Sequence, residues 1–138
     1  DRLLSRGLGD VYKRQIACPS EVSVSKNTIK WLEEQNKHLI ISDNVNDIAK
    51  NSDCIMTDTW ISMGDNKDKS IDHFKPFQVN SNVMLLAKKD VIFMHCLPAY
   101  RGMEVTDEVI DSKSSVVFDQ AENRVHAQKS IIKYCCKS

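Results

Sequence analysis

Three short segments of the chain combine residue types that could bind a small polar molecule and act on it. The first runs from Asp58 to Gly64 (DTWISMG) and holds a carboxylate, two hydroxyls and a terminal glycine. The second is His95-Cys96-Leu97-Pro98, and the third is Glu122-Asn123-Arg124. Each segment has a chemical interpretation and a purely structural one, and both are kept open here.

The segment from Asp58 to Gly64 suits an amino acid. A carboxylate pairs with an ammonium group, and a hydroxyl together with backbone N–H groups suits a carboxylate, so one loop could hold both ends of an amino acid. In the structural interpretation Asp58 caps a helix, while Trp60 and Met63 belong to the core.

The segment His95-Cys96 suits proton transfer or the binding of a cation. A thiolate can bind an ammonium group or accept a proton, and an imidazole can form a hydrogen bond with a carbonyl oxygen. The structural interpretation is a buried cysteine beside a hydrogen-bonded histidine. A zinc site is not indicated, because no second His-Cys cluster has the spacing of zinc ligands.

Two arginines have weaker patterns. Arg124, in the first turn of the last predicted helix, suits an anion or a polarised carbonyl, whereas the structural interpretation is a surface pair with Glu122. Arg101-Gly102 is either a loop that closes over the site or a simple turn.

The elements that must position these residues follow from the apolar patterning. The predicted strands are the end of one at 16–19, then 38–42, 53–58, 91–95 and 115–118. The predicted helices are 27–37, a helix capped by Asp43 or Asn44, 65–74 as a solvated segment, 83–88 capped by Asn80 or Ser81, one capped by Thr106, and 121–134.

Strands that alternate with helices and are apolar on both faces predict an α/β fold with a parallel sheet covered by helices on both sides. In such sheets the ligand crevice lies at the carboxyl ends of the strands. Asp58 follows one predicted strand, His95 and Cys96 end another, and Arg124 comes after a third. We therefore expect these polar residues to meet at one edge.

The amino-acid composition argues against several classes of protein. The chain has 138 residues, enough for one core, and its 19 Lys+Arg balance 19 Asp+Glu, which indicates neither a nucleic acid nor an anionic membrane as partner. No apolar run reaches the roughly 20 residues of a membrane span. The five cysteines include no CxxC pair, so we expect a reducing cytoplasm rather than a disulfide framework.

Residues 1–15 form a basic stretch whose Gly7-Leu8-Gly9 lacks the third glycine of a dinucleotide fingerprint. We interpret 1–15 as a non-native or disordered leader, the alternative being a natural linker, and 16–138 as the folded domain.

Together, DTWISMG, His95-Cys96-Leu97-Pro98, Gln78-Val79-Asn80 and the segment from Phe118 to Arg124 (FDQAENR) resemble the ornithine carbamoyltransferases. The resemblance covers the carboxy-terminal, ornithine-binding half of that family. It implies a three-layer, Rossmann-like α/β domain, truncated here at its amino-terminal strand and helix.

The resemblance also implies roles. Asp58, Ser62 and Met63 would bind L-ornithine, whereas His95, Cys96, Leu97 and Arg124 would line the carbamoyl phosphate side. Cys96 and His95 would be the catalytic residues. No metal or cofactor is implied, and the full-length protein would be a homotrimer that makes citrulline for arginine biosynthesis.

The departures from the family limit what this chain does alone. The family's carbamoyl phosphate domain, with its Ser-x-Arg-Thr-Arg loop, is absent, as is its Gly-Asp-Gly-Asn-Asn stretch. We expect this fragment to be inactive by itself. The alternatives are a non-catalytic amino-acid-binding relative and a carbamoyltransferase for another amine.

Overall fold

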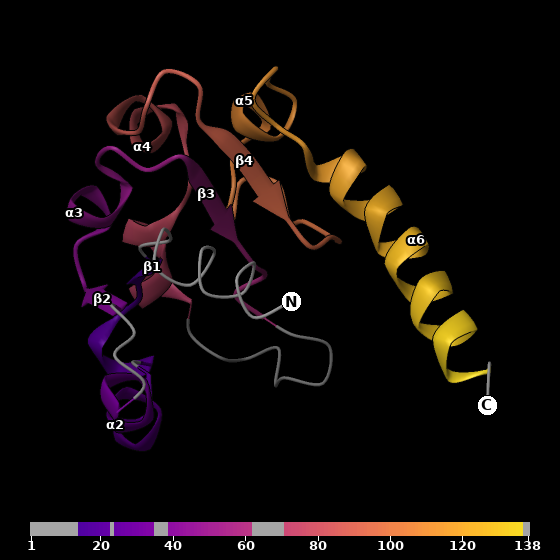
Figure 1. The fold of residues 1–138 in the computed structure, drawn as a ribbon. Helices are drawn as coiled ribbons and strands as arrows, with labels where there is room; N and C mark the ends of the chain where they lie inside the picture. Colours follow the sequence, from indigo (N-terminus) through magenta and orange to yellow (C-terminus); the bar gives the residue numbers. More distant parts are fainter. Residues whose placement is uncertain (1–13, 23, 35–38, 62–70, 137–138) are drawn as a thin grey trace. The chain divides into compact units, whose positions relative to one another are not determined.

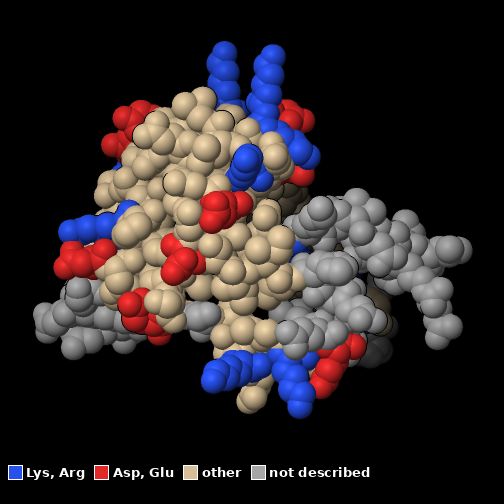
Figure 2. All heavy atoms as spheres, turned by 90° about the vertical axis from the view of Figure 1, so that its left-hand side faces the viewer, with Lys and Arg blue, Asp and Glu red and all other residues tan. Residues whose placement is uncertain are grey.

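The computed structural model describes residues 14–22, 24–34, 39–61 and 71–136 (Figure 1). The chain divides into two compact units, residues 1–48 and 49–138, and each is described by itself. Within the described residues no helix is both long and apolar enough to cross a lipid bilayer. Figure 2 shows acidic and basic side chains interspersed rather than gathered in a patch of one sign, as the balanced composition predicts.

The first unit is built on one pair of parallel strands. Its elements are β1 (Arg14–Ala17), the 3₁₀ helix η1 (Ser20–Val22), α2 (Lys26–Glu34), β2 (Leu39–Ser42) and α3 (Val45–Ala49), the last of which ends in the second unit. Strands β1 and β2 pair in parallel, from Arg14 opposite Leu39 to Ala17 opposite Ser42. Two parallel strands begin at the same end of the sheet, so the chain between them must cross back to that end, and α2 lies in this crossover connection.

Side-chain caps fix where the helices of this unit begin. The Ser25 hydroxyl accepts a hydrogen bond from the backbone N–H of Thr28 at 3.2 Å, one of the N–H groups that the first turn of α2 leaves unpaired. The Asn44 side chain accepts one from Asn46 at 3.1 Å, which confirms Asn44 as the cap of α3.

The second unit holds the pair that positions the candidate site. Its elements are β3 (Cys54–Thr57), η2 (Asp72–Phe77), α4 (Ser81–Leu86), β4 (Ile92–His95), α5 (Asp107–Ile110) and α6 (Val117–Cys135). In Figure 1, β3 and β4 lie side by side and point the same way, in a parallel register that runs from Cys54 opposite Ile92 to Thr57 opposite His95. The Asn80 side chain caps α4 by accepting from the Val83 N–H at 3.1 Å, as predicted.

The core of the second unit is apolar apart from one polar pair. Three apolar side chains have at most 1% of their surface exposed: Phe93 of β4, Val105 just before α5, and Val117 at the start of α6. His95 and Glu104 are equally buried, at 0% exposure. A carboxyl group and an imidazole in the centre of a small core need a specific reason, because burial without partners is costly.

One predicted strand is wrong. Residues 115–118 do not form a strand, since only Ser115 makes an isolated parallel bridge, to Phe93, and α6 already begins at Val117. The last helix was predicted to begin at Ala121. The β-propensity of these residues depends on their packing, and here Val117 is buried whereas Phe118 is 73% exposed at the start of the helix.

Three further differences concern segments rather than the site. The predicted strands were expected in one sheet, whereas the structure describes two separate parallel pairs, one in each unit. The strand expected from Ile16 begins at Arg14, inside the leader predicted over residues 1–15, of which 1–13 lie outside the described part. The solvated helix predicted over 65–74 is described only from residue 71, where η2 is a 3₁₀ helix.

Candidate active site

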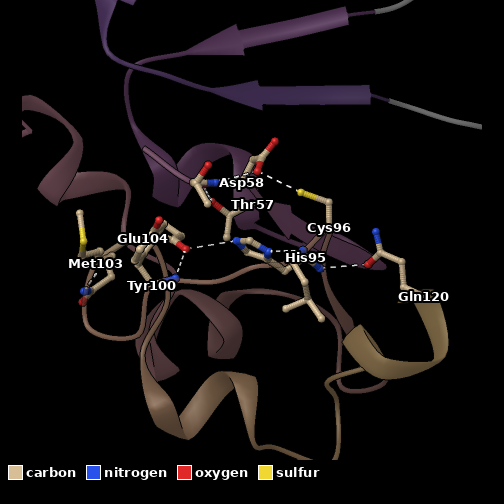
Figure 3. Close-up of polar contacts among 11 residues, drawn as sticks. Thr57, Asp58, His95, Cys96, Tyr100, Met103, Glu104 and Gln120 are labelled. Atoms are coloured by element: carbon tan, nitrogen blue, oxygen red, sulfur yellow. Dashed lines mark hydrogen bonds and ion pairs between the residues drawn. The ribbon is translucent and has the colours of Figure 1, made fainter. Parts of the chain in front are cut away.

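Two motifs meet at the carboxyl ends of β3 and β4. The last paired residues of these strands are Thr57 and His95, so the next residues on each, Asp58 and Cys96, leave the sheet at the same edge. The Cys96 thiol donates a hydrogen bond to Asp58 Oδ1 at 3.0 Å (Figure 3). The prediction that these two residues lie at one edge is therefore confirmed.

The contact fixes the charge state of both groups. The hydrogen bond from Cys96 lowers the pKa of the Asp58 carboxyl, and the backbone N–H of Thr59, 2.7 Å from Oδ1, lowers it further. In return, the hydrogen bond to Asp58 raises the pKa of the Cys96 thiol above its ordinary value, while the positive charge of Arg124 opposes that rise to a smaller extent. At neutral pH, Asp58 is thus charged and Cys96 is a protonated thiol.

His95 points away from this pair, into the core. Its Nδ1 accepts a hydrogen bond from the Leu97 N–H at 2.9 Å, so in the neutral ring the proton must sit on Nε2. Nε2 lies 3.2 Å from Glu104 Oε1, within ion-pair distance, although the alignment is too poor for a well-formed hydrogen bond. The ring is thereby fixed in orientation and tautomer from both sides.

Glu104 is the site residue that the motifs did not reveal. Its Oε1 accepts a hydrogen bond from the Tyr100 N–H at 2.6 Å and faces His95, while Oε2 is buried without a hydrogen-bond partner among the described residues. The available signal was only an acid between two apolar residues, Met103 and Val105. A fully buried carboxylate with so few donors is expensive, which is a feature of functional sites.

The turn between His95 and Pro98 has a strained backbone. Leu97 adopts φ 55°, in the left-handed region that a side chain with Cβ disfavours by about 1–2 kcal/mol, and the Leu97–Pro98 peptide bond is cis. The hydrogen bond between the Leu97 N–H and His95 Nδ1 holds this conformation. Non-glycine residues held at positive φ cluster at ligand sites.

The other residues predicted for the site are placed as follows. Arg124 is exposed on α6, one turn beyond Gln120, and its charge acts on Cys96. Ser62 and Met63 lie outside the described residues. Arg101 does not extend over the site, because its guanidinium bonds Asp107 and Asp111 at 2.6–2.8 Å.

Gly102, next to Arg101, has φ 79° and forms a turn that suits glycine. In the part of the chain that the structure describes, no group of three or more His, Cys, Asp or Glu side chains could hold a metal ion.

Known proteins resemble the chain along nearly its whole length. The model of the aspartate/ornithine carbamoyltransferase family, Asp/Orn binding domain, matches residues 11–135. An ornithine carbamoyltransferase from Rhodopseudomonas palustris (strain ATCC BAA-98 / CGA009) is 52% identical over 126 residues, which are 90% of this chain and 40% of that protein. The chain therefore spans less than half the length of this relative.

Solved structures agree with the sequence comparison. The ornithine carbamoyltransferase from Pyrococcus furiosus has a TM-score of 0.79 and 41% identity, over 94% of this chain and 44% of its own. The anabolic ornithine carbamoyltransferase from Campylobacter jejuni has a TM-score of 0.82 and 31% identity, over 95% and 44%. Both comparisons cover more than nine tenths of this chain.

Proposed function

Because the chain belongs to the aspartate/ornithine carbamoyltransferase family and matches its Asp/Orn binding domain, we propose that the full-length protein is an ornithine carbamoyltransferase. It transfers the carbamoyl group of carbamoyl phosphate to the δ-amine of L-ornithine and releases citrulline and phosphate. The observation that carries the proposal is the contact between Asp58 and Cys96, two groups 38 residues apart in the chain. This pair is suited to an amino-acid substrate with a free ammonium group.

Asp58 is the proposed ligand of the ornithine α-ammonium. Its carboxylate is exposed and, because its pKa is lowered, stays charged across the neutral range. A charge-assisted hydrogen bond between carboxylate and ammonium is roughly twice as strong as a neutral one. Ser62 and Met63, a few residues further along the same loop, are assigned to the rest of the amino-acid part of ornithine.

The carbamoyl phosphate side is assigned to His95, Cys96, Leu97 and Arg124. The guanidinium of Arg124 attracts the carbamoyl oxygen and stabilises the negative charge that develops there when the carbonyl carbon is attacked. The buried contacts of His95 and the held turn at Leu97 support this assignment, since a fixed backbone keeps its polar groups in place without reorganisation.

The reaction is an acyl transfer. The neutral δ-nitrogen attacks the carbamoyl carbon, the new C–N bond forms, the bond from that carbon to the phosphate oxygen breaks, and the nitrogen loses one proton. Cys96 is the proposed proton acceptor, although the hydrogen bond to Asp58 raises the pKa of its thiol. When an ammonium group binds Asp58, it offsets the carboxylate charge that raises the pKa of Cys96, so substrate binding favours the thiolate.

Other properties of the proposed enzyme follow from the same assignment. The full-length protein is a cytoplasmic homotrimer, and its citrulline serves arginine biosynthesis, in keeping with the anabolic Campylobacter jejuni structure. The chain alone is expected to be inactive, because it spans only 40% of its Rhodopseudomonas palustris relative. The competing possibilities are an amine other than ornithine as acceptor and a non-catalytic amino-acid-binding protein.

The test replaces Asp58 in the full-length protein. Asp58→Asn keeps the shape and removes the charge. A charge-assisted hydrogen bond is worth about 1.5–3 kcal/mol, so ornithine affinity should fall by roughly one to two powers of ten, nearer to one because Asp58 is exposed. Carbamoyl phosphate affinity should stay the same.

The matched control is Asp53→Asn, which removes an equal charge next to the amino end of β3, where Asp53 pairs with Lys88. This control should leave both affinities unchanged. If Asp58→Asn weakened carbamoyl phosphate and spared ornithine, the assignment of the loop would be wrong. A wild-type protein that binds ornithine but makes no citrulline would support the non-catalytic alternative.

A further inference from the structure

We propose that Gln120 and Gln78 are positioning residues that hold the two ends of the segment 95–104, which carries His95, Cys96 and Glu104. Gln120 fixes the beginning of the segment and Gln78 fixes its end. The proposal rests on the proposed function for its catalytic meaning, but the contacts that carry it, and its test, involve no substrate.

Gln120 replaces a missing strand next to β4. Along the free edge of β4, the Phe93 N–H donates to Ser114 O at 2.8 Å and the Val116 N–H donates to Phe93 O at 3.0 Å. Alternate residues of a strand present their N–H groups to the same side, so the next N–H on this side of β4 belongs to His95. A strand that continued beside β4 would supply a backbone carbonyl to accept from it.

The chain has by then turned into α6, and the side chain of Gln120 supplies the acceptor. Its Oε1 lies 3.0 Å from the His95 N–H (Figure 3). Gln120 Oε1 thus takes the place of the backbone carbonyl that the predicted strand at 115–118 would have supplied to the His95 N–H. It fixes the backbone at the point where His95 turns into the core and Cys96 turns toward Asp58.

Gln78 holds the other end through its amide nitrogen. Nε2 donates to Gly102 O at 2.9 Å and to Met103 O at 2.7 Å, so both of its protons are used. The adjoining backbone is tied in the same place, because the Val79 N–H donates to Glu104 O at 2.9 Å. Gln78 therefore sets the position from which Glu104 reaches His95.

The two glutamines use opposite halves of the same functional group. Gln120 acts as an acceptor toward an N–H, and Gln78 acts as a donor toward two carbonyl oxygens. Replacement by glutamate keeps the size of the side chain and its acceptors but removes the donors. The same substitution should therefore be tolerated at position 120 and disruptive at position 78, where a carboxylate would face two carbonyl oxygens.

The test uses hydrogen exchange at residue resolution in the full-length protein. Gln120→Met should speed exchange of the His95 amide by about tenfold, the factor that corresponds to one ordinary hydrogen bond, whereas Gln120→Glu should keep it protected. Gln78→Glu should speed exchange of the Tyr100 amide, which is protected by Glu104, and Gln78→Met should do so less.

A second readout separates positioning from general stability. Gln120→Met should move the pH profile of Cys96 alkylation to lower pH, because the contact with Asp58 loosens, and peptide mass spectrometry distinguishes Cys96 from the other cysteines. The control Asn80→Ala, which removes the cap of α4, should lower the unfolding midpoint and leave that profile unchanged. Equal effects of Met and Glu at position 120, or an unchanged His95 amide in Gln120→Met, would overturn the proposal. Neither result would bear on whether ornithine is the substrate.

Discussion

The buried pair of His95 and Glu104 leads to the most demanding prediction. Glu104→Ala removes the acceptor of the Tyr100 N–H, which donates to it at 2.6 Å, and the ion-pair partner of the buried His95 ring, whose Nε2 lies 3.2 Å away. A donor that loses its hydrogen-bond partner costs about 1–3 kcal/mol, so the free energy of unfolding should fall by roughly 1–3 kcal/mol. That is a substantial part of the ~5–15 kcal/mol by which a domain is stable.

Glu104→Gln is the matched variant. Its side-chain oxygen can still accept from the Tyr100 N–H, while the buried charge is gone, so the loss of stability should be smaller than in Glu104→Ala. The contrast between the alanine and glutamine variants isolates the acceptor from the volume of the side chain. It also keeps the prediction testable if the alanine variant fails to fold.

Urea denaturation followed by the fluorescence of Trp60 measures the effect. Trp60 belongs to the second unit and stacks on Phe74 at a ring distance of 6.0 Å, and Trp31→Phe removes the other tryptophan, which is largely exposed. With a slope of about 2 kcal/mol per molar urea, Glu104→Ala should lower the midpoint by roughly 0.5–1.5 M. An unchanged midpoint in Glu104→Ala, or an equal fall in both variants, would refute the claim that the Glu104 acceptor stabilises the fold.

Four further predictions concern charge and capping. Alkylation of Cys96 should need a higher pH than that of an ordinary thiol, and Asp58→Asn should shift its profile to lower pH, because the carboxylate is the main cause of the raised pKa. The raised pKa of Cys96 stabilises the fold below the ordinary thiol pKa, and the lowered pKa of Asp58 stabilises it above the ordinary carboxyl pKa. The contribution of this contact should therefore fade as pH rises through the thiol range or falls through the carboxyl range. A pH series of unfolding midpoints that is identical in Asp58→Asn would contradict this. Asn80→Ala should cost about 0.5–2 kcal/mol of stability in urea denaturation, through loss of the α4 cap. Asp111→Asn, which breaks an exposed pair with Arg101, should lower the unfolding midpoint only slightly and lose that effect at high salt, and a large, salt-independent fall would contradict this.

The sequence determined the elements around the site because their signals are local. Alternation of apolar runs gave β2, β3 and β4, and Asn44 and Asn80 were correctly predicted as caps, since a cap acts on residues two or three positions away. The meeting of Asp58 and Cys96 was also predictable. Parallel strands place their carboxyl ends at one edge whatever their side chains are, so two polar motifs that each follow such a strand must come close.

Only the tertiary structure decided which polar groups support that site. Glu104, Gln78 and Gln120 carry no motif that assigns them a partner, because the value of a side-chain donor or acceptor depends on which backbone group lies unpaired beside it after folding. The same cause explains the wrong strand at 115–118. Its apolar residues fit a strand as well as a buried helix start, and the sequence does not show that α6 begins at Val117 or that the side-chain oxygen of Gln120 accepts from the His95 N–H in place of a further strand.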